Sequence, residues 1–139
     1  MTSLDGKVAL VTGAGRGIGR AVAIMLAQSG CRVILCARTV EQLQAAEREI
    51  KNHNGTAWTI SADLTDDAAV QRVAAESRLS FGSVDILVNN AGWGKRAPVA
   101  KARIEDWDQT LRLNLRAPMM LARELLPDMI AKGEGAVIN

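Results

Sequence analysis

A glycine-rich segment near the N-terminus has the composition of a phosphate-binding turn. Residues 12–19 read T-G-A-G-R-G-I-G and stand between an apolar run and a sequence with helical periodicity. In that setting the backbone N–H groups of the turn and of the helix N-terminus can face a pyrophosphate. A Cβ at Gly13 would obstruct the tight turn, one at Gly17 would hold the phosphates off the backbone, and one at Gly19 would push the helix off the sheet. The remaining expected contacts of this turn are Gly15, Arg16 and Ile18.

Basic residues stand where an acid would select NAD. A carboxylate at the end of the second predicted strand, roughly 20 residues beyond the glycine turn, would bind the ribose hydroxyls of NAD and repel a 2′-phosphate. Ala37 and Arg38 occupy that place, and Arg16 lies in the turn. Two guanidinium groups offer planar, charge-assisted hydrogen bonds to a phosphate, and the hydroxyl of Thr39 could add another. The alternative is that both arginines are solvated surface side chains.

Further polar groups follow the later predicted elements. Asp63 and Leu64 come after the third strand, and Asn89, Asn90, Ala91 and Gly92 come after the fourth. Taken alone, Asp63 could be a loop residue near a helix cap, and the second segment could be an ordinary strand-ending turn.

Asn114 is harder to explain as a surface residue. It follows Trp107 and Leu111 at i, i+4 and i+7, which places it on the helix face expected to be buried. A buried amide needs partners or costs about 1–3 kcal/mol. A purely structural hydrogen bond is the alternative to a functional role.

Short apolar runs alternate with helical segments along the chain. This alternation is typical of a parallel sheet with helices on both faces, and it predicts an α/β doubly wound sheet, a Rossmann fold. We interpret residues 1–139 as one dinucleotide-binding domain that is incomplete and truncated in its fifth strand. The motifs should meet at the carboxyl ends of the strands. The predicted strands cover residues 8–11, 33–37, 57–60, 84–88 and 135–138.

The helices between these strands have predicted buried faces. Thr65 is the expected N-cap of the third helix. Long helical segments cover approximately residues 104–132, and we expect them to be bent or interrupted near Pro118, with Pro127 as a second candidate position. The expected buried residues of the first three helices are Ile18, Val22, Met25 and Leu26, then Val40, Leu43 and Ile50, then Val70, Val73 and Ala74.

The spacing T-G-x3-G-x-G resembles the short-chain dehydrogenase/reductase family in its classical form. Asp63-Leu64 looks like the adenine-contacting acidic position of this family, and residues 89–92 are similar to its NNAG signature. Asn114 falls where the family keeps a helix asparagine. These four motifs stand in the family's order and cover essentially the whole chain.

The resemblance implies an NADP(H)-dependent oxidoreductase that transfers a hydride between the cofactor and a carbonyl or alcohol substrate. In the family a tyrosine gives the proton, a lysine and a serine assist it, and the helix asparagine holds a water. Only Asn114 matches here, and the sequence has no tyrosine. We expect the serine shortly after Asn139 and the Tyr-x-x-x-Lys pair beyond it, so the chain as given should bind cofactor without turnover. The family's habit implies a homo-oligomer, a dimer or tetramer, for the intact protein.

Composition excludes several other classes. The 139 residues are 48% hydrophobic and 23% charged, so the chain is long and apolar enough to form a hydrophobic core. The net charge is +2, and the basic residues are scattered along the chain, which gives little support to a nucleic-acid partner. No apolar run approaches the roughly twenty residues of a membrane span, and residues 1–7 do not read as a leader, so we expect a cytoplasmic protein. Cys31 and Cys36 are too far apart along an extended strand to bridge and are interpreted as buried thiols. The lone His53 has no partners that suggest a metal site.

Two alternatives remain. The chain could be a non-catalytic nucleotide-binding module or a truncated fragment, and a Ser followed by Tyr-x-x-x-Lys in the continuing sequence would decide for the enzyme. A methyl-donor-binding α/β domain also uses a glycine-rich turn. Such a domain would normally want an acid near position 37, where this chain has Ala37 and Arg38.

Overall fold

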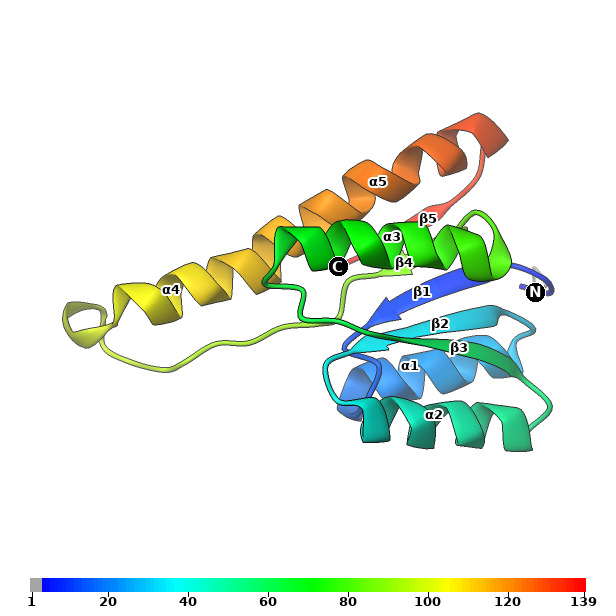
Figure 1. Ribbon diagram of the computed structural model, residues 1–139, viewed down its shortest axis with the longest axis horizontal. Coiled ribbons are helices and arrows are strands. Elements are labelled where there is room, and N and C mark those ends of the chain that lie inside the picture. The colour runs from blue at the N-terminus through cyan, green and yellow to red at the C-terminus, as the bar shows by residue number, and fades with distance from the viewer. Residues whose placement is uncertain (1–3) are drawn as a thin grey trace.

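A five-stranded parallel sheet in the order β3-β2-β1-β4-β5 organises the computed structural model, which describes residues 4–139 (Figure 1). This confirms the predicted doubly wound α/β fold. The first three residues of segment 1–7, which we did not expect to be a leader, lie outside the described residues. No helix within residues 4–139 is both long and apolar enough to span a membrane. The strands are β1 (Val8–Thr12), β2 (Arg32–Ala37), β3 (Thr56–Ser61), β4 (Ile86–Val88) and β5 (Ala136–Ile138).

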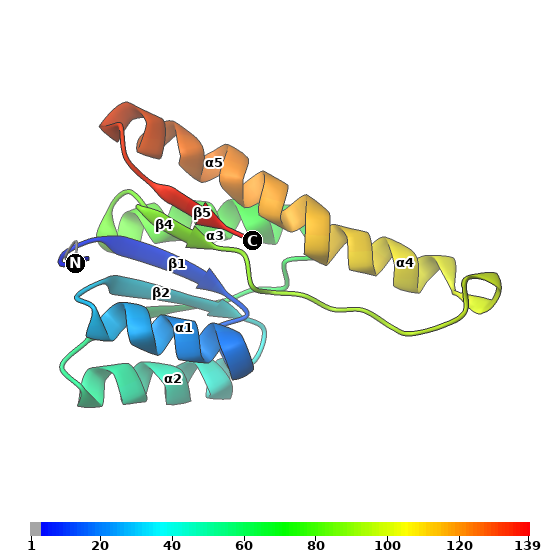
Figure 2. The same cartoon turned by 180° about the vertical axis from the view of Figure 1, so that it is seen from behind.

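Two helical layers cover the sheet (Figures 1 and 2). Helices α1 (Gly17–Gln28) and α2 (Val40–Asn52) lie on one face, and α3 (Asp67–Phe81) and α5 (Ala117–Lys132) lie on the other. Successive strand residues point to opposite faces, so Val11 joins the apolar cluster under α1 and α2 while Leu10 joins the cluster under α3 and α5. Every residue of β1 is buried, as expected for a strand at the centre of a parallel sheet.

Helix α1 packs through small residues, and this corrects the predicted face. Its buried residues are Gly19, Ala23 and Ala27, at i, i+4 and i+8. Ile18 is 76% exposed and Met25 is 65% exposed, so both were wrongly placed in the core. Small side chains let the helix axis come close to the sheet, and the large residues are then left on its flanks.

The other predicted faces fared better. Val22 and Leu26 pack partly against the core, while Leu43 and Ile50 of α2 are buried, as predicted. The three predicted residues of α3, Val70, Val73 and Ala74, are also buried. Val40 was wrong, because this first residue of α2 is 45% exposed.

The cap of α3 also differs from the prediction. Asp66 is the N-cap, and its carboxylate accepts a hydrogen bond from the N–H of Ala68 at 3.1 Å. Thr65, the predicted cap, donates its backbone N–H and its hydroxyl to Asp63 Oδ1 at 3.0 and 2.8 Å. The threonine therefore holds Asp63 in place instead of capping the helix.

The long helical segment is interrupted before its first proline. Helix α4 (Ile104–Leu111) passes into a π-helical turn at Arg112–Arg116 and then into α5. Pro118 lies in the first turn of α5, directly after the π-helical turn, so the predicted interruption near this proline is confirmed. Pro127 lies inside α5 without ending it.

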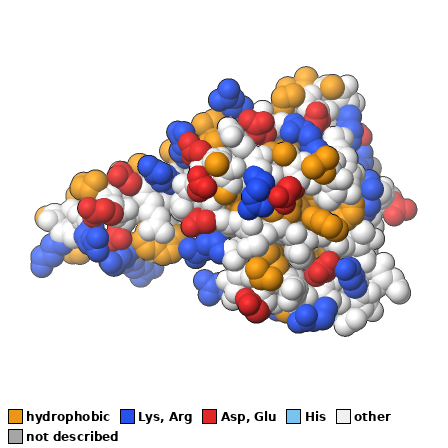
Figure 3. Space-filling model, viewed as in Figure 1, with side chains coloured by type: hydrophobic (Ala, Val, Ile, Leu, Met, Phe, Trp, Pro, Cys, Tyr) orange, Lys and Arg blue, Asp and Glu red, His pale blue; other side chains and the backbone are white. Residues whose placement is uncertain are grey.

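Helix α4 and the loop before it project from the body (Figures 1 and 2). Apolar side chains lie exposed among charged ones along this projection (Figure 3). They include Ile104, 70% exposed, and Trp107, 60% exposed.

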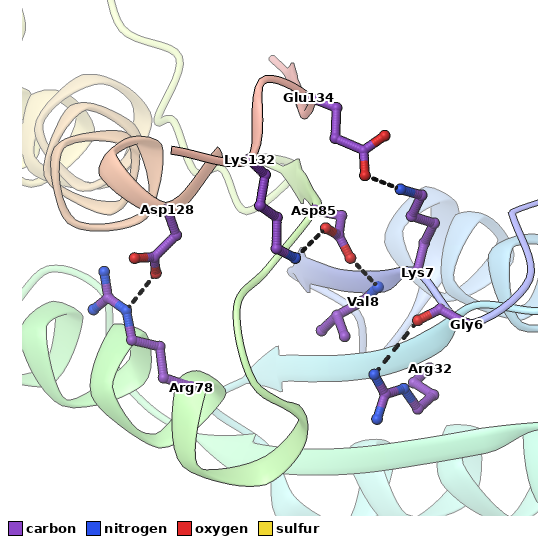
Figure 4. A network of polar contacts seen from close by, with 9 residues as sticks. All are labelled: Gly6, Lys7, Val8, Arg32, Arg78, Asp85, Asp128, Lys132 and Glu134. Carbon is purple, nitrogen blue, oxygen red and sulfur yellow. Dashed lines mark hydrogen bonds and ion pairs between the residues drawn. The ribbon is translucent and has the colours of Figure 1, made fainter. Parts of the chain in front are cut away.

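A polar network joins residues at the N-terminal ends of β1 and β4 (Figure 4). Asp85, just before β4, accepts hydrogen bonds from the N–H of Val8 at 2.9 Å and from Nζ of Lys132 at 2.7 Å. Burial alone would raise the pKa of the Asp85 carboxyl. The hydrogen bonds from Lys132 and Val8, with the charges of Lys132 and Lys7, outweigh that effect and hold the pKa below its ordinary value. An ion pair between Lys7 and Glu134 closes the network beside it.

Candidate functional site

A cavity of about 690 Å³ opens at the carboxyl ends of the strands, within the range of small-molecule sites. It is formed by the loops that follow β1, β2, β3 and β4, with one residue from the π-helical turn. Every predicted cofactor-binding residue lines it except Gly19. These lining residues are Gly13, Gly15, Arg16, Gly17, Ile18, Arg38, Thr39, Asp63, Leu64, Asn90, Ala91 and Gly92.

Sequence reasoning missed several lining residues. Cys36, Gln42, Ala62 and Leu113 also face the cavity. Cys36 is the next-to-last residue of β2 and Ala62 follows β3, so the motifs beside them could have indicated both. Gln42 carried a signal that was not used, since it lies three residues after Thr39 in the pattern of a helix cap.

The glycine turn has the backbone geometry that its sequence predicts. Gly13 has φ +66° and Gly17 has φ +56°, a region that side chains rarely adopt. A Cβ on Gly13 would also lie 2.8 Å from Asn90 Nδ2. Gly19 lies behind the turn, and a Cβ there would overlap the carbonyl of Gly13 and the amide of Asn90. The absence of a side chain at Gly19 therefore preserves the conformation of the glycine turn, and it also allows α1 to approach the sheet.

The segment after β4 is tied to the end of β1. The hydroxyl of Thr12 accepts hydrogen bonds from the N–H groups of Asn90 and Ala91 at 3.0 and 2.9 Å, and it donates to the carbonyl of Val88 at 3.3 Å. The Asn90 side chain donates to the carbonyl of Thr12 at 3.1 Å. Asn90 thus holds two cavity loops together, which an isolated strand-ending turn would not do.

The wall beside the end of β2 is basic. Arg16 and Arg38 are exposed at the cavity, and neither forms an ion pair within residues 4–139. The carboxyl of Asp63 lies on the same wall, and hydrogen bonds from Thr65 lower its pKa, with a further contribution from the charge of Arg38. Two guanidinium groups that form no ion pair, together with one carboxylate already bound by Thr65, leave this wall suited to an anion.

Asn114 is placed differently from the prediction. It is exposed and does not line the cavity, although Leu113 of the same π-helical turn does. Its amide still has two partners, since Oδ1 accepts the N–H of Trp93 at 2.9 Å and Nδ2 donates to the carbonyl of Trp93 at 2.9 Å. These bonds fix the loop that leaves β4.

The cysteines are free and buried, as predicted. Burial raises the pKa of the Cys36 thiol to about 12, so it stays protonated although it borders the cavity. Residues 4–139 hold no group of three or more His, Cys, Asp or Glu side chains placed to bind a metal ion.

A glycine turn at the carboxyl edge of a parallel sheet, opening on a cavity beside β1, defines a Rossmann-type α/β protein. The chain belongs to the short-chain dehydrogenase family, whose model matches residues 7–139. It is similar to D-threitol dehydrogenase of Mycolicibacterium smegmatis, with 38% identity over 136 residues that cover 98% of this chain and 52% of that protein.

Solved structures are similar over the whole fold. A metagenomic short-chain oxidoreductase in complex with NADP has 44% identity and a TM-score of 0.95, covering 99% of this chain and 63% of its own. The L-sorbose reductase of Gluconobacter frateurii, complexed with NADPH and L-sorbose, has 39% identity and a TM-score of 0.92, covering 96% of this chain and 51% of its own. The chain thus spans about half the length of the curated relatives that it matches.

Proposed function

We propose that this chain is the nucleotide-binding part of an NADP(H)-dependent oxidoreductase that acts on a small carbonyl or alcohol substrate. The observation that carries the proposal is the cavity wall at the end of β2. Arg16, Arg38 and Thr39 line it, and Ala37 stands where a carboxylate would select NAD. The relatives solved with NADP or NADPH support the same cofactor.

The cavity fits the cofactor by its backbone as well as its charge. Gly17 has open space where its side chain would be, so a phosphate can approach the N–H groups of the turn. Asp63 and Leu64 line the part of the cavity where we place the adenosine. Asn90, Ala91 and Gly92 form the wall beside β4, where we place the nicotinamide end. The bound nicotinamide would supply the hydride, and the chain's own residues would hold and orient it.

The proton step is assigned to residues outside these 139. The sequence has no tyrosine, and Asn114 is the one residue that we assign to a proton relay, through a water that it would hold. We therefore propose that the 139-residue chain binds cofactor without turnover. We also propose a cytoplasmic homo-oligomer for the whole protein.

The Arg38→Asp variant tests the cofactor assignment. A carboxylate at this position would repel the 2′-phosphate and accept the ribose hydroxyls, so NADPH affinity should fall at least about tenfold while NADH affinity falls much less. Calorimetric titration of the 139-residue chain with each nucleotide measures both. Arg48→Asp, on an exposed site of α2 away from the cavity, makes the same charge change and serves as control. Equal losses for the two nucleotides would sink the assignment.

A further inference from the structure

The start of α2 has the sequence of a capping box, but the hydrogen bonds of that motif are not formed in the structure. Thr39 is the N-cap and Gln42 is the third helical residue. In such a box the hydroxyl accepts from the N–H of the third residue, and the amide reaches back to the N–H of the cap. Here the Thr39 side chain makes no capping hydrogen bond, and the Gln42 amide has no hydrogen-bond partner within residues 4–139. Both polar groups are thus available to something else.

Gln42 packs against Gly15 of the glycine turn instead. A Cβ on Gly15 would lie 2.9 Å from Gln42 Oε1 and 3.0 Å from Gln42 Cβ. Gly15 is buried and is not among the glycines with positive φ, so its backbone conformation does not require glycine. A side chain at position 15 would therefore force the Gln42 side chain to shift from its place against the turn.

This packing puts the Gln42 side chain in the basic wall of the cavity. Gln42 lines the cavity together with Arg16, Arg38 and Thr39. Asp63 is the one acid among the lining residues, and it is engaged with Thr65. The wall therefore offers two cations, a hydroxyl and an unpaired amide, which together suit a ligand that accepts hydrogen bonds and carries negative charge.

We propose that Gln42 is a specificity-determining residue whose amide N–H donates to the 2′-phosphate of NADP(H), and that Gly15 is kept small to hold that amide in place. The inference rests on the proposed function, since it requires the dinucleotide in this cavity. It adds a neutral donor to the two arginines, and it gives a role to an amide that caps no helix end and lines the cavity.

Two substitutions at position 42 test whether the Gln42 amide donates a hydrogen bond to the 2′-phosphate. Gln42→Ala removes the donor, and Gln42→Glu keeps the shape but puts an anion in its place. We expect NADPH affinity to fall about tenfold in Gln42→Ala, equivalent to ~1.4 kcal/mol, and further in Gln42→Glu. NADH affinity should stay within about twofold of wild type, because NADH lacks the acceptor. Gln44→Ala, on the exposed side of the same helix, is the matched control and should change neither.

Unfolding of the cofactor-free chain shows whether Gln42 acts only on the fold. Because its amide caps nothing, Gln42→Ala should leave the urea midpoint unchanged. A lower midpoint with equal losses for NADPH and NADH would overturn the inference. If Arg38→Asp abolishes the NADPH preference while the Gln42 variants keep the wild-type ratio, this inference fails and the proposed function stands. If the wild-type chain binds neither nucleotide, both fail.

Discussion

Replacing Asp85 should destabilise the sheet by an amount that depends on which of its hydrogen bonds survives. One carboxylate oxygen accepts the N–H of Val8 at 2.9 Å, and the other accepts Nζ of Lys132 at 2.7 Å. Val8 is 1% exposed, whereas the Lys132 side chain is 41% exposed. Lys132 can turn to water when its partner is removed, and the N–H of Val8 cannot.

Because Val8 and Lys132 differ in burial, two substitutions of Asp85 should lower the free energy of unfolding by different amounts. Asp85→Ala leaves the N–H of Val8 buried and unpaired, at about 1–3 kcal/mol, and also loses a half-exposed ion pair worth ~0.5–1 kcal/mol. Its total cost is therefore about 1.5–4 kcal/mol. Asp85→Asn keeps an oxygen that can accept the Val8 hydrogen bond, so it should cost only ~1 kcal/mol.

Urea unfolding of both variants at neutral pH measures these losses. The pH dependence adds a second check, because a carboxyl whose pKa is lower in the folded chain stabilises the fold above its unfolded pKa of about 3.9. The stability gap between wild type and Asp85→Asn should hold down to about pH 5 and close as the pH falls through the folded-state pKa. Equal losses for Asp85→Ala and Asp85→Asn, or a gap that is independent of pH, would refute this reasoning.

Three further outcomes are expected. Gly19→Ala sets a Cβ against the carbonyl of Gly13 and the amide of Asn90, so it should cost at least ~2 kcal/mol and abolish nucleotide binding; wild-type stability and affinity would contradict the geometry. Asn114→Ala removes both hydrogen bonds to the Trp93 backbone, so amide exchange at Trp93 should accelerate without a change in global stability. Cys36, with a pKa of about 12, should react with a thiol reagent near about pH 8 only after unfolding, and rapid labelling of the folded chain would count against its burial.

The sheet and its functional edge could be predicted because they depend on patterns local to each strand. Leu10 and its neighbours form a continuous apolar run, and polar or glycine-rich segments follow at Gly13, Asp63 and Asn90. Parallel strands place their carboxyl ends on one edge, so these segments had to meet there.

The face of α1 could not be predicted by weighting large apolar residues. Ile18 and Met25 fit a helical stripe, but the closest approach to the sheet is made by Ala23 and Ala27. Asn114 was expected to be buried on the same kind of argument, but it lies exposed in the π-helical turn, where Leu113 packs against the core instead. Periodicity identifies a stripe but does not say what the stripe packs against.

Gln42 shows a different limit. The pattern T-x-x-Q predicts a capping box from local sequence alone. Its side chain instead lies against Gly15, which belongs to another loop. The direction of a long polar side chain is thus decided by a tertiary neighbour that no local pattern contains.

The central position of β1 bears on the order in which the cavity can form. Residues 8–61 build β1, β2 and β3 by successive neighbouring pairings, and β4 then crosses to the opposite side of β1. The glycine turn belongs to the early unit, whereas Asn90, which closes the cavity through Thr12, arrives with the later one. A nucleotide that touches both would stabilise their docking by linkage. Cofactor binding should then slow hydrogen exchange in β4 more than in β3. The ligand would thus stabilise the last step in assembling the sheet as well as bind to the finished cavity.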